Sequence, residues 1–285
     1  MKKIKNVLYF YRILGWKEKM TGLGAIGYTF LGYALSGRFK FLSYFLNTFV
    51  VFLGTLFAFS VNNFYDWKVQ GEKNFLGEKI ESGKISENKA LFFCFLPFLF
   101  GLFLSFLSFF LGLIPTFSFF LLVFLFLLTF FYAKPPLRLK ERRFFGFLAV
   151  PLGSFLIFLE SYFIVGRLTL NLIFFVVLFF LFETYLEILH VLDDSLSETE
   201  IKKLDQKKAL RLLKILPTTS LFTSLCFSFS NPIFLNTFAF SSLRLFSLRN
   251  FKLEEARKIR KNVFSFQTSF YEYFVYGILG LFRLI

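Results

Sequence analysis

Long uncharged stretches alternate with charged segments along the whole chain. Lys, Arg, Asp and Glu are all absent from residues 20–37, 41–65, 90–133 and 215–243. Because a helix needs about 20 apolar residues to cross a bilayer, the longest stretch has room for two such helices, separated near Pro115. The pattern therefore predicts an all-α, polytopic membrane protein.

Extended over the full chain, the pattern predicts about nine transmembrane helices. We expect them at 20–37, 41–62, 89–111, 116–133, 144–165, 169–190, 209–229, 232–248 and 264–284. The seventh and eighth predicted helices are divided at the turn signal Ser228–Pro232. We expect residues 1–285 to form one membrane domain, with a short basic segment at 1–19.

Composition and charge agree with this class of protein. The chain is 56% hydrophobic and contains 51 Phe residues, which is more apolar surface than a soluble domain of this length can bury. A net charge of +15 raises the question of nucleic acid, but the sequence contains no soluble basic domain, so we expect no such partner. In a membrane protein this charge is typical of topology signals and of attraction to anionic lipids or substrates.

The charged residues gather in alternate connections between the predicted helices. The N-terminal segment and segments 63–89, 134–143, 191–214 and 249–261 carry almost all of them. Since positively charged connections stay in the cytoplasm, we expect an integral protein of the cell membrane whose N-terminus and long polar segments are cytoplasmic. Acidic residues contribute little to orientation, so their presence in 63–89 favours a functional site on that face, with a central cavity opening there.

The end of the second predicted helix carries a stripe of oxygen-bearing side chains. Asn62, Asp66 and Gln70 recur every four residues, so they share one face if the helix continues. Carboxylate and amide oxygens arranged in this way suit a hard cation such as Mg²⁺. A polar helix end that enters water explains the segment equally well.

A second stripe closes the sixth predicted helix. It has helical spacing and consists of Glu183, Glu187, His190, Asp194 and Glu198. An ionisable group at bilayer depth costs about 2.5–3.5 kcal/mol, so we expect the first three to face a polar cavity rather than lipid. For His190, a hydrogen-bonded packing role is the more common alternative to a catalytic one.

A basic turn lies between the two stripes. Pro135 and Pro136 stop the preceding helix, so that Lys134, Arg138 and Lys140 extend from a constrained segment. Cations beside two carboxylate faces suit a diphosphate held partly through metal and partly through Lys and Arg. The positive-inside rule alone explains the charge as well.

Taken in order, these segments resemble the UbiA superfamily of intramembrane prenyltransferases. The family's first signature, Asn-Asp-x-x-Asp-x-x-x-Asp, is matched by Asn62, Asn63, Asp66 and Gln70. The family's Tyr-Ser-x-Pro-Pro-x-Arg-Leu-Lys element is similar to 132–140.

Further along the chain, the second signature, Asp-x-x-x-Asp, is matched by Asp194 and Glu198. Gly146 stands where the family has a bulky residue followed by glycine.

Three signature positions depart from the family pattern. Asn63 and Gln70 stand where the family has Asp, and Glu198 replaces the final Asp. Amides can ligate Mg²⁺ but carry no charge, so metal affinity is expected to fall unless Glu72 or another carboxylate compensates.

The resemblance implies transfer of a polyprenyl group from a polyprenyl diphosphate to an aromatic quinone precursor or lipid, with Mg²⁺ assisting departure of the pyrophosphate. The metal ligands that it implies are Asn62, Asp66, Gln70, Asp194 and Glu198. The catalytic residues that it implies are Asp66, Asp194 and Lys140. The substrate contacts that it implies are Asn62, Asn63, Tyr132, Lys134, Arg138, Glu187 and His190.

Two other functions are compatible with the sequence. An ion- or proton-coupled transporter would use the ionisable residues inside the predicted helices, among them Glu160 and Glu272. A degenerate family member would bind prenyl lipid without turnover, because two acids of the first signature are missing. Glu160 and Glu272 either line an acceptor cavity or only pair with Arg or Tyr side chains.

Overall fold

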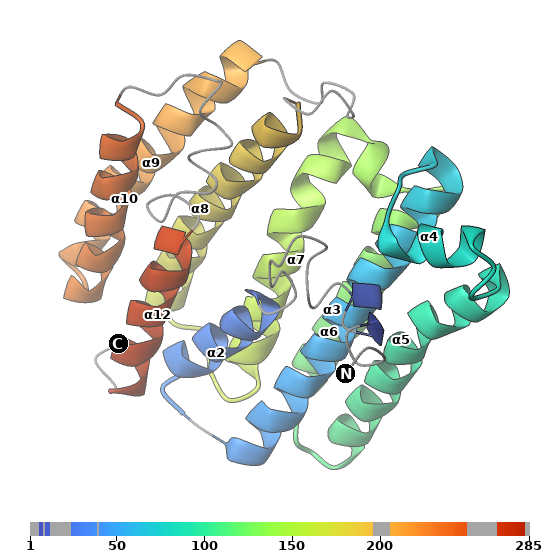
Figure 1. The fold of residues 1–285 in the computed structure, drawn as a ribbon. Helices are drawn as coiled ribbons and strands as arrows, with labels where there is room; N and C mark the ends of the chain where they lie inside the picture. The colour runs from blue at the N-terminus through green and yellow to red at the C-terminus, as the bar shows by residue number, and fades with distance from the viewer. Residues whose placement is uncertain are drawn as a thin grey trace. The chain divides into compact units, whose positions relative to one another are not determined.

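The computed structural model describes residues 6, 7, 9–11, 24–38, 40–195, 206–249 and 267–282. Within these residues the regular structure is entirely helical (Figure 1). The α-helices are α2 Gly24–Leu35, α3 Phe41–Gln70, α4 Phe75–Glu81, α5 Glu87–Phe110, α6 Thr116–Ala133, α7 Arg143–Phe163, α8 Leu170–Ser195, α9 Gln206–Ser228, α10 Leu235–Ser247 and α12 Gln267–Leu281. Short 3₁₀ turns occur at Leu139–Glu141 and Pro232–Phe234.

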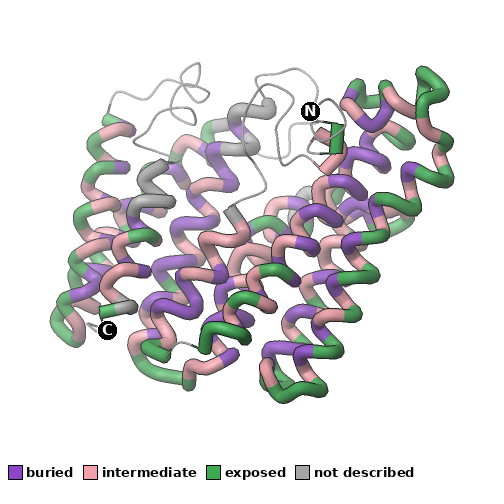
Figure 2. The backbone as a smooth tube through the Cα atoms, turned by 60° about the horizontal axis from the view of Figure 1, so that its bottom comes forward, coloured by how far each residue is buried: buried purple, intermediate pink, exposed green. Residues whose placement is uncertain are grey.

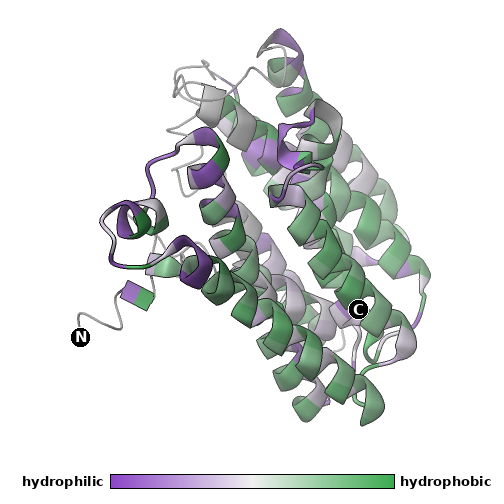
Figure 3. Cartoon of the chain, turned by 90° about the vertical axis from the view of Figure 1, so that its right-hand side faces the viewer, coloured by the Kyte–Doolittle hydropathy of each residue, from purple (hydrophilic) through white to green (hydrophobic). Residues whose placement is uncertain are grey.

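The all-α membrane class is confirmed. Every range expected to span the membrane contains a helix, and six helices are long and apolar enough to cross a bilayer, namely α3, α5, α6, α7, α8 and α9. The helix α2 is apolar but shorter. Figure 3 shows the long helices as hydrophobic along most of their length and hydrophilic toward their ends and connections. The total of nine spans stays a prediction.

The chain falls into two compact units, which are described separately. Unit 1 contains Met1–Tyr33, Phe39–Ala149 and Leu156–Val165. Unit 2 contains Ala34–Arg38, Val150–Phe155 and Gly166–Ile285. The single domain expected over 1–285 stays a prediction.

In unit 1, α3 packs against both α5 and α6. Small residues permit the close approach, since a Cβ at Gly101 would lie 2.8 Å from the Phe126 ring and one at Gly54 would lie 3.2 Å from it. Helices in lipid associate by such close packing around small residues, because lipid tails are as apolar as the side chains themselves. The apolar core around Phe126 includes Phe57 and Leu122.

The helix α5 shows where the large apolar residues go. Its buried positions are mostly small, namely Ala90, Cys94, Pro97, Gly101, Ser105 and Ser108. Its exposed positions are large, and include Phe92, Phe100, Phe103 and Phe106. Figure 2 shows buried and exposed residues alternating along the long helices in this way. Exposed rings around a small-residue interior fit a helix that faces lipid.

A buried carboxyl group joins three helices of unit 1. Glu160 of α7 is fully buried and its Oε2 accepts hydrogen bonds from Asn47 Nδ2 of α3 at 2.9 Å and from Ser161 Oγ at 3.1 Å. Ser118 of α6 donates to the Glu160 carbonyl at 3.0 Å. Within unit 1, the Glu160 carboxyl group therefore accepts from an amide and a hydroxyl, and the Glu160 carbonyl accepts from a second hydroxyl.

In unit 2, α9 packs against α8 and α10, and α10 packs against α12. Glu272 of α12 forms an ion pair with Arg244 of α10 and accepts from Thr237 Oγ1 at 2.6 Å. The Arg244 guanidinium also lies over the Phe182 ring of α8, 3.8 Å from its centroid. Of the two alternatives for Glu272, the structure shows the pairing with Arg.

Candidate functional site

The first stripe is built on an extended helix. The helix α3 continues through Gln70 and ends at Gly71, whose φ of 67° lies in the left-handed region that favours glycine. Its 30 residues correspond to a length of about 45 Å, whereas the hydrocarbon core of a bilayer is about 30 Å thick. The helix does continue past the predicted span, so the condition is met and Asn62, Asp66 and Gln70 share one face at the end of α3.

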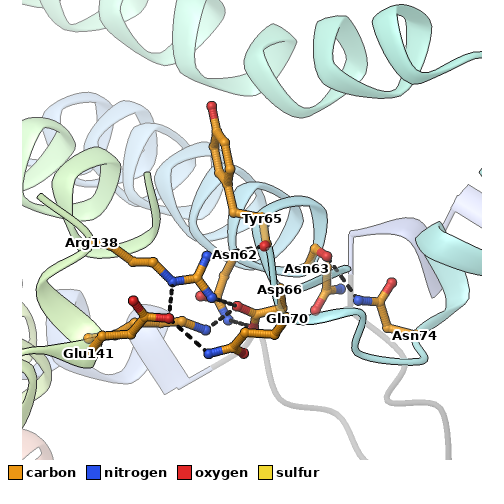
Figure 4. Close-up of polar contacts among 9 residues, drawn as sticks. Asn62, Asn63, Tyr65, Asp66, Gln70, Asn74, Arg138 and Glu141 are labelled. Carbon is orange, nitrogen blue, oxygen red and sulfur yellow. Dashed lines mark hydrogen bonds and ion pairs between the residues drawn. The ribbon is translucent and has the colours of Figure 1, made fainter. Parts of the chain in front are cut away.

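Asp66 is the centre of the polar contacts in unit 1 (Figure 4). Its buried carboxylate forms ion pairs through Oδ1 with Arg138 Nη2 at 3.1 Å and with Lys140 Nζ. Its Oδ2 accepts a hydrogen bond from Asn62 Nδ2 at 2.9 Å. A buried charge is costly unless it is paired and hydrogen-bonded, and these partners supply both kinds of contact to the carboxylate.

The two cations come from the turn that follows α6. This helix ends at Ala133, directly before Lys134-Pro135-Pro136, as the prolines predict. Arg138 has a φ of 35°, in the left-handed region, which costs a residue with a side chain about 1–2 kcal/mol. Its side chain is only 4% exposed and its Nη1 donates to the Tyr65 carbonyl at 3.1 Å. The turn is therefore held in a strained conformation that places a guanidinium at the end of α3.

A glycine allows the same turn to lie against the beginning of α7. A Cβ at Gly146 would stand 2.5 Å from the Lys140 carbonyl oxygen and 3.0 Å from that of Leu139. Only a residue without a side chain permits this approach. The position of Lys140 beside Asp66 thus depends on a small residue in another element.

Glu141 is a residue of this site that the sequence patterns did not single out. Its Oε1 lies 2.6 Å from Arg138 Nε and accepts a hydrogen bond from Gln70 Nε2 at 3.0 Å. Figure 4 shows Glu141 at the end of the stripe, beside Gln70. The one signal in the sequence was a carboxylate three residues after Arg138.

The helix α4 is fastened to the end of α3 by hydrogen bonds. Asn74 caps α4 by accepting from the Gly77 N–H at 2.9 Å, and its amide donates to the Asn63 carbonyl at 2.8 Å. Trp67 Nε1 of α3 donates to Glu81 of α4 at 2.8 Å. Asn63 itself is buried. These contacts fix the polar segment after α3 as a short helix beside the first stripe.

The remaining residues of unit 1 expected at the site lie at the end of α6 and directly after it. Tyr132 is half-buried in the last turn of α6. Lys134 Nζ lies over the Phe130 ring, 4.6 Å from its centroid. The structure therefore brings Arg138 and Lys140 to Asp66, whereas Lys134 contacts an aromatic ring.

The second stripe lies in unit 2. Glu183 and Glu187 are buried in α8, and Tyr273 Oη of α12 donates to Glu183 Oε1 at 3.0 Å. The backbone of His190 and Asp194 belongs to the last turns of α8, and their side chains are outside the described part of the structure. Glu198 falls outside the described residues altogether.

The donor set of the first stripe fits a hard cation. Among the residues that the structure describes, no three His, Cys, Asp or Glu side chains form a cage. The stripe nevertheless holds the carboxylate of Asp66 beside Asn62 Oδ1, a buried oxygen without a hydrogen-bond partner. Carboxylate and amide oxygens are the ligands that Mg²⁺ accepts, and a buried oxygen without a donor is a ready ligand.

One family model matches most of the chain. A model described as the UbiA prenyltransferase family matches residues 25–270. No protein of curated function matches the sequence.

Several solved structures share the fold. A UbiA homologue from Archaeoglobus fulgidus bound to GPP and Mg²⁺ has 16% identity and a TM-score of 0.73, over 97% of this chain and 99% of that one. The same homologue bound to DMAPP and Mg²⁺ gives a TM-score of 0.71 at 16% identity, with the same coverage. A structure of digeranylgeranylglyceryl phosphate synthase has 18% identity and a TM-score of 0.71, over 99% of each chain.

Proposed function

Since the chain belongs to the UbiA prenyltransferase family, we propose that it transfers a polyprenyl group from a polyprenyl diphosphate to an acceptor within the membrane. The observation that carries the proposal is the buried Asp66 carboxylate, held at the end of α3 beside the cations of Arg138 and Lys140. This arrangement combines a ligand for a metal ion with partners for a diphosphate.

In this proposal Asn62 and Asp66 hold Mg²⁺, and Asp194 and Glu198 of the second signature complete its ligands. Bound there, Mg²⁺ supplies positive charge that stabilises the departing pyrophosphate. Gln70 contributes through its amide. The homologue from Archaeoglobus fulgidus has been solved with GPP and Mg²⁺ and with DMAPP and Mg²⁺, which supports the same pairing of substrate and metal in this chain.

The cations of the chain itself stabilise the remaining negative charge of the diphosphate. Arg138 and Lys140 exchange their contacts with Asp66 for the diphosphate oxygens, so that the negative charge of the leaving group is met by groups already in position. Tyr132, Lys134 and Asn63 contact the substrate from the same end of unit 1. Glu187 and His190 do so from α8, and the prenyl tail lies along apolar helices.

The proposal includes the sidedness and the acceptor. The N-terminus and the diphosphate site face the cytoplasm, because the charged segments gather at alternate connections. The acceptor is an aromatic quinone precursor or a lipid, and mass spectrometry of lipids from a host that makes several prenyl diphosphates would identify the product.

Alanine substitution at either signature tests the function. We expect Asp66→Ala and Asp194→Ala each to lower prenyl transfer in membranes more than about 100-fold, while the protein still inserts. Glu87→Ala is the control, because Glu87 pairs with Lys68 at an exposed position and has no place in the mechanism. Full activity in either aspartate variant would overturn the proposal, and binding of a prenyl diphosphate without turnover in the unaltered protein would favour the degenerate alternative.

A further inference from the structure

The first stripe of α3 carries a single carboxylate, yet the structure places two carboxylates there. Asp66 lies within α3, whereas Glu141 reaches the stripe from the turn between α6 and α7 and accepts the Gln70 amide at 3.0 Å. Gln70 is the position where the first signature of the resemblance has an acid. The turn thus brings a carboxylate to the residue of the stripe at which an amide stands in place of the signature's acid.

Arg138 forms ion pairs with both carboxylates through one planar group. Its Nη2 lies 3.1 Å from Asp66 Oδ1 and its Nε lies 2.6 Å from Glu141 Oε1. Two carboxylates near each other repel unless a cation lies between them, and here the guanidinium takes that place. With Lys140 also paired to Asp66, the cluster has as many positive as negative side chains.

Glu141 remains accessible while Asp66 does not. The Glu141 side chain is 46% exposed, so a cation from solution can reach it without displacing the packing of unit 1. The buried Asn62 Oδ1, which has no hydrogen-bond partner, lies in the same stripe. The site therefore offers a divalent cation a buried carboxylate, Asp66, and an exposed one, Glu141, and both are paired with the Arg138 guanidinium.

We propose that Glu141 supplies the second carboxylate of the divalent-cation site, in place of the charge that Gln70 lacks. The inference rests on the proposed function, since it concerns the metal that accompanies the diphosphate. When the diphosphate draws Arg138 away, Glu141 is released to the cation. The number of charged ligands sets the affinity of an oxygen site for a divalent cation, so Glu141 raises the affinity that the amides would otherwise leave low.

A purely positioning role for Glu141 makes a different prediction. If Glu141 only orients Arg138, removing its charge weakens binding of the diphosphate by the same factor at every Mg²⁺ concentration. If Glu141 ligates the cation, the loss is overcome by more Mg²⁺. The Mg²⁺ midpoint therefore separates the two roles.

The experiment measures binding rather than turnover. Purified protein in detergent is titrated with Mg²⁺ at a saturating concentration of geranyl S-thiolodiphosphate, a poorly reactive analogue, and the thermal midpoint is followed. Glu141→Gln should raise the Mg²⁺ concentration for half-maximal stabilisation about tenfold or more. Mn²⁺ binding followed by electron paramagnetic resonance should weaken by a similar factor. Glu87→Gln is the matched control, since Glu87 is 42% exposed and paired with a cation, and it should leave both values unchanged.

A second substitution completes the test. Gln70→Asp in the Glu141→Gln background returns a carboxylate to the stripe, so it should bring the Mg²⁺ midpoint back toward that of the unaltered protein. An unchanged midpoint in Glu141→Gln, a loss that Mg²⁺ does not overcome, or a double variant no better than Glu141→Gln would each overturn the inference. If the unaltered protein showed no Mg²⁺-dependent binding of the analogue, the proposed function itself would fail.

Discussion

Arg138 is the residue on which most contacts of the first site converge. Its guanidinium contacts the Asp66 carboxylate, the Glu141 carboxylate and the Tyr65 carbonyl, using a different nitrogen for each. A guanidinium presents its donors in a rigid planar fork, whereas an ammonium is a single point charge. Charge alone therefore does not explain why an arginine occupies this position.

Arg138→Lys tests this geometric requirement. The variant keeps the charge but cannot reach all three acceptors, and each lost hydrogen bond to a charged group is worth about 1.5–3 kcal/mol. We expect the catalytic efficiency with a prenyl diphosphate to fall tenfold or more in a radiolabel transfer assay. Arg142→Lys is the control, because Arg142 is exposed and its Nε donates only to the Leu137 carbonyl within the turn. Equal activity of the two variants would show that position 138 needs only a positive charge.

The sequence identified these residues unequally. Asp66 and Arg138 were predicted because each belongs to a recognisable pattern, a stripe with helical spacing and a basic segment after two prolines. Glu141 was not predicted, because its place in the site depends on a contact with the Gln70 amide, which lies 71 residues away in the chain. Local patterns contain no information about which residue of a turn faces which residue of a distant helix.

At the scale of elements, the sequence predicted the membrane span of α3, but neither the end of α3 nor the helix that follows it. The apolar pattern placed a span at 41–62, whereas the helix continues to Gln70. Hydropathy reports where a helix leaves the membrane, and hydrogen bonds decide where it ends. The helix α4 has no apolar run of its own, so hydropathy could not predict it. It is held by its cap at Asn74 and by its contact with Trp67.

The turn between α6 and α7 depends on Gly146, which makes an element-scale prediction. In Gly146→Ala the new methyl group would come within 2.5 Å of the Lys140 carbonyl oxygen, so the backbone of the turn must shift. The ion pair between Lys140 and Asp66 should weaken, and prenyl transfer should fall about tenfold or more, since misplacement by about 1 Å can cost far more.

The same helix offers a matched control for this prediction. Gly153 also lies in α7, but a Cβ there has no atom within 4 Å. Gly153→Ala should therefore preserve the transfer rate, measured with the same amount of inserted protein. A Gly146→Ala variant as active as Gly153→Ala would show that the turn tolerates the displacement.

At the scale of the whole molecule, large apolar residues occupy exposed positions as well as the core, where Phe57 and Phe126 lie. Exposed positions of α5 are occupied by Phe and its buried positions by small residues, the reverse of a soluble protein, where large apolar side chains fill the core. The long uncharged stretches predicted the class, and the composition agreed, because so much apolar surface needs lipid. Composition could not predict which Phe residues pack, since a ring that faces lipid and a ring in the core contribute equally to hydropathy.

The proposed sidedness in the membrane can be tested through the number of helices between two exposed positions. Between Lys84 and Leu168 the chain passes through α5, α6 and α7, each of which is long and apolar enough to cross a bilayer. If all three helices cross, the two positions lie on opposite sides of the membrane, and the orientation that we propose from the positive-inside rule puts Lys84 in the cytoplasm. Both positions are exposed, and Leu168 is 72% exposed.

Single cysteines at these positions turn the argument into a measurement. Cys94 is buried and Cys226 is exposed, so Cys226→Ser provides a background with little native labelling. A maleimide that cannot cross membranes should label Leu168→Cys in intact cells, and Lys84→Cys only in inverted vesicles. Labelling of both from the same side would mean that one of the three helices does not span, and the reversed pattern would place the Asp66 site outside the cell, away from cytoplasmic prenyl diphosphates.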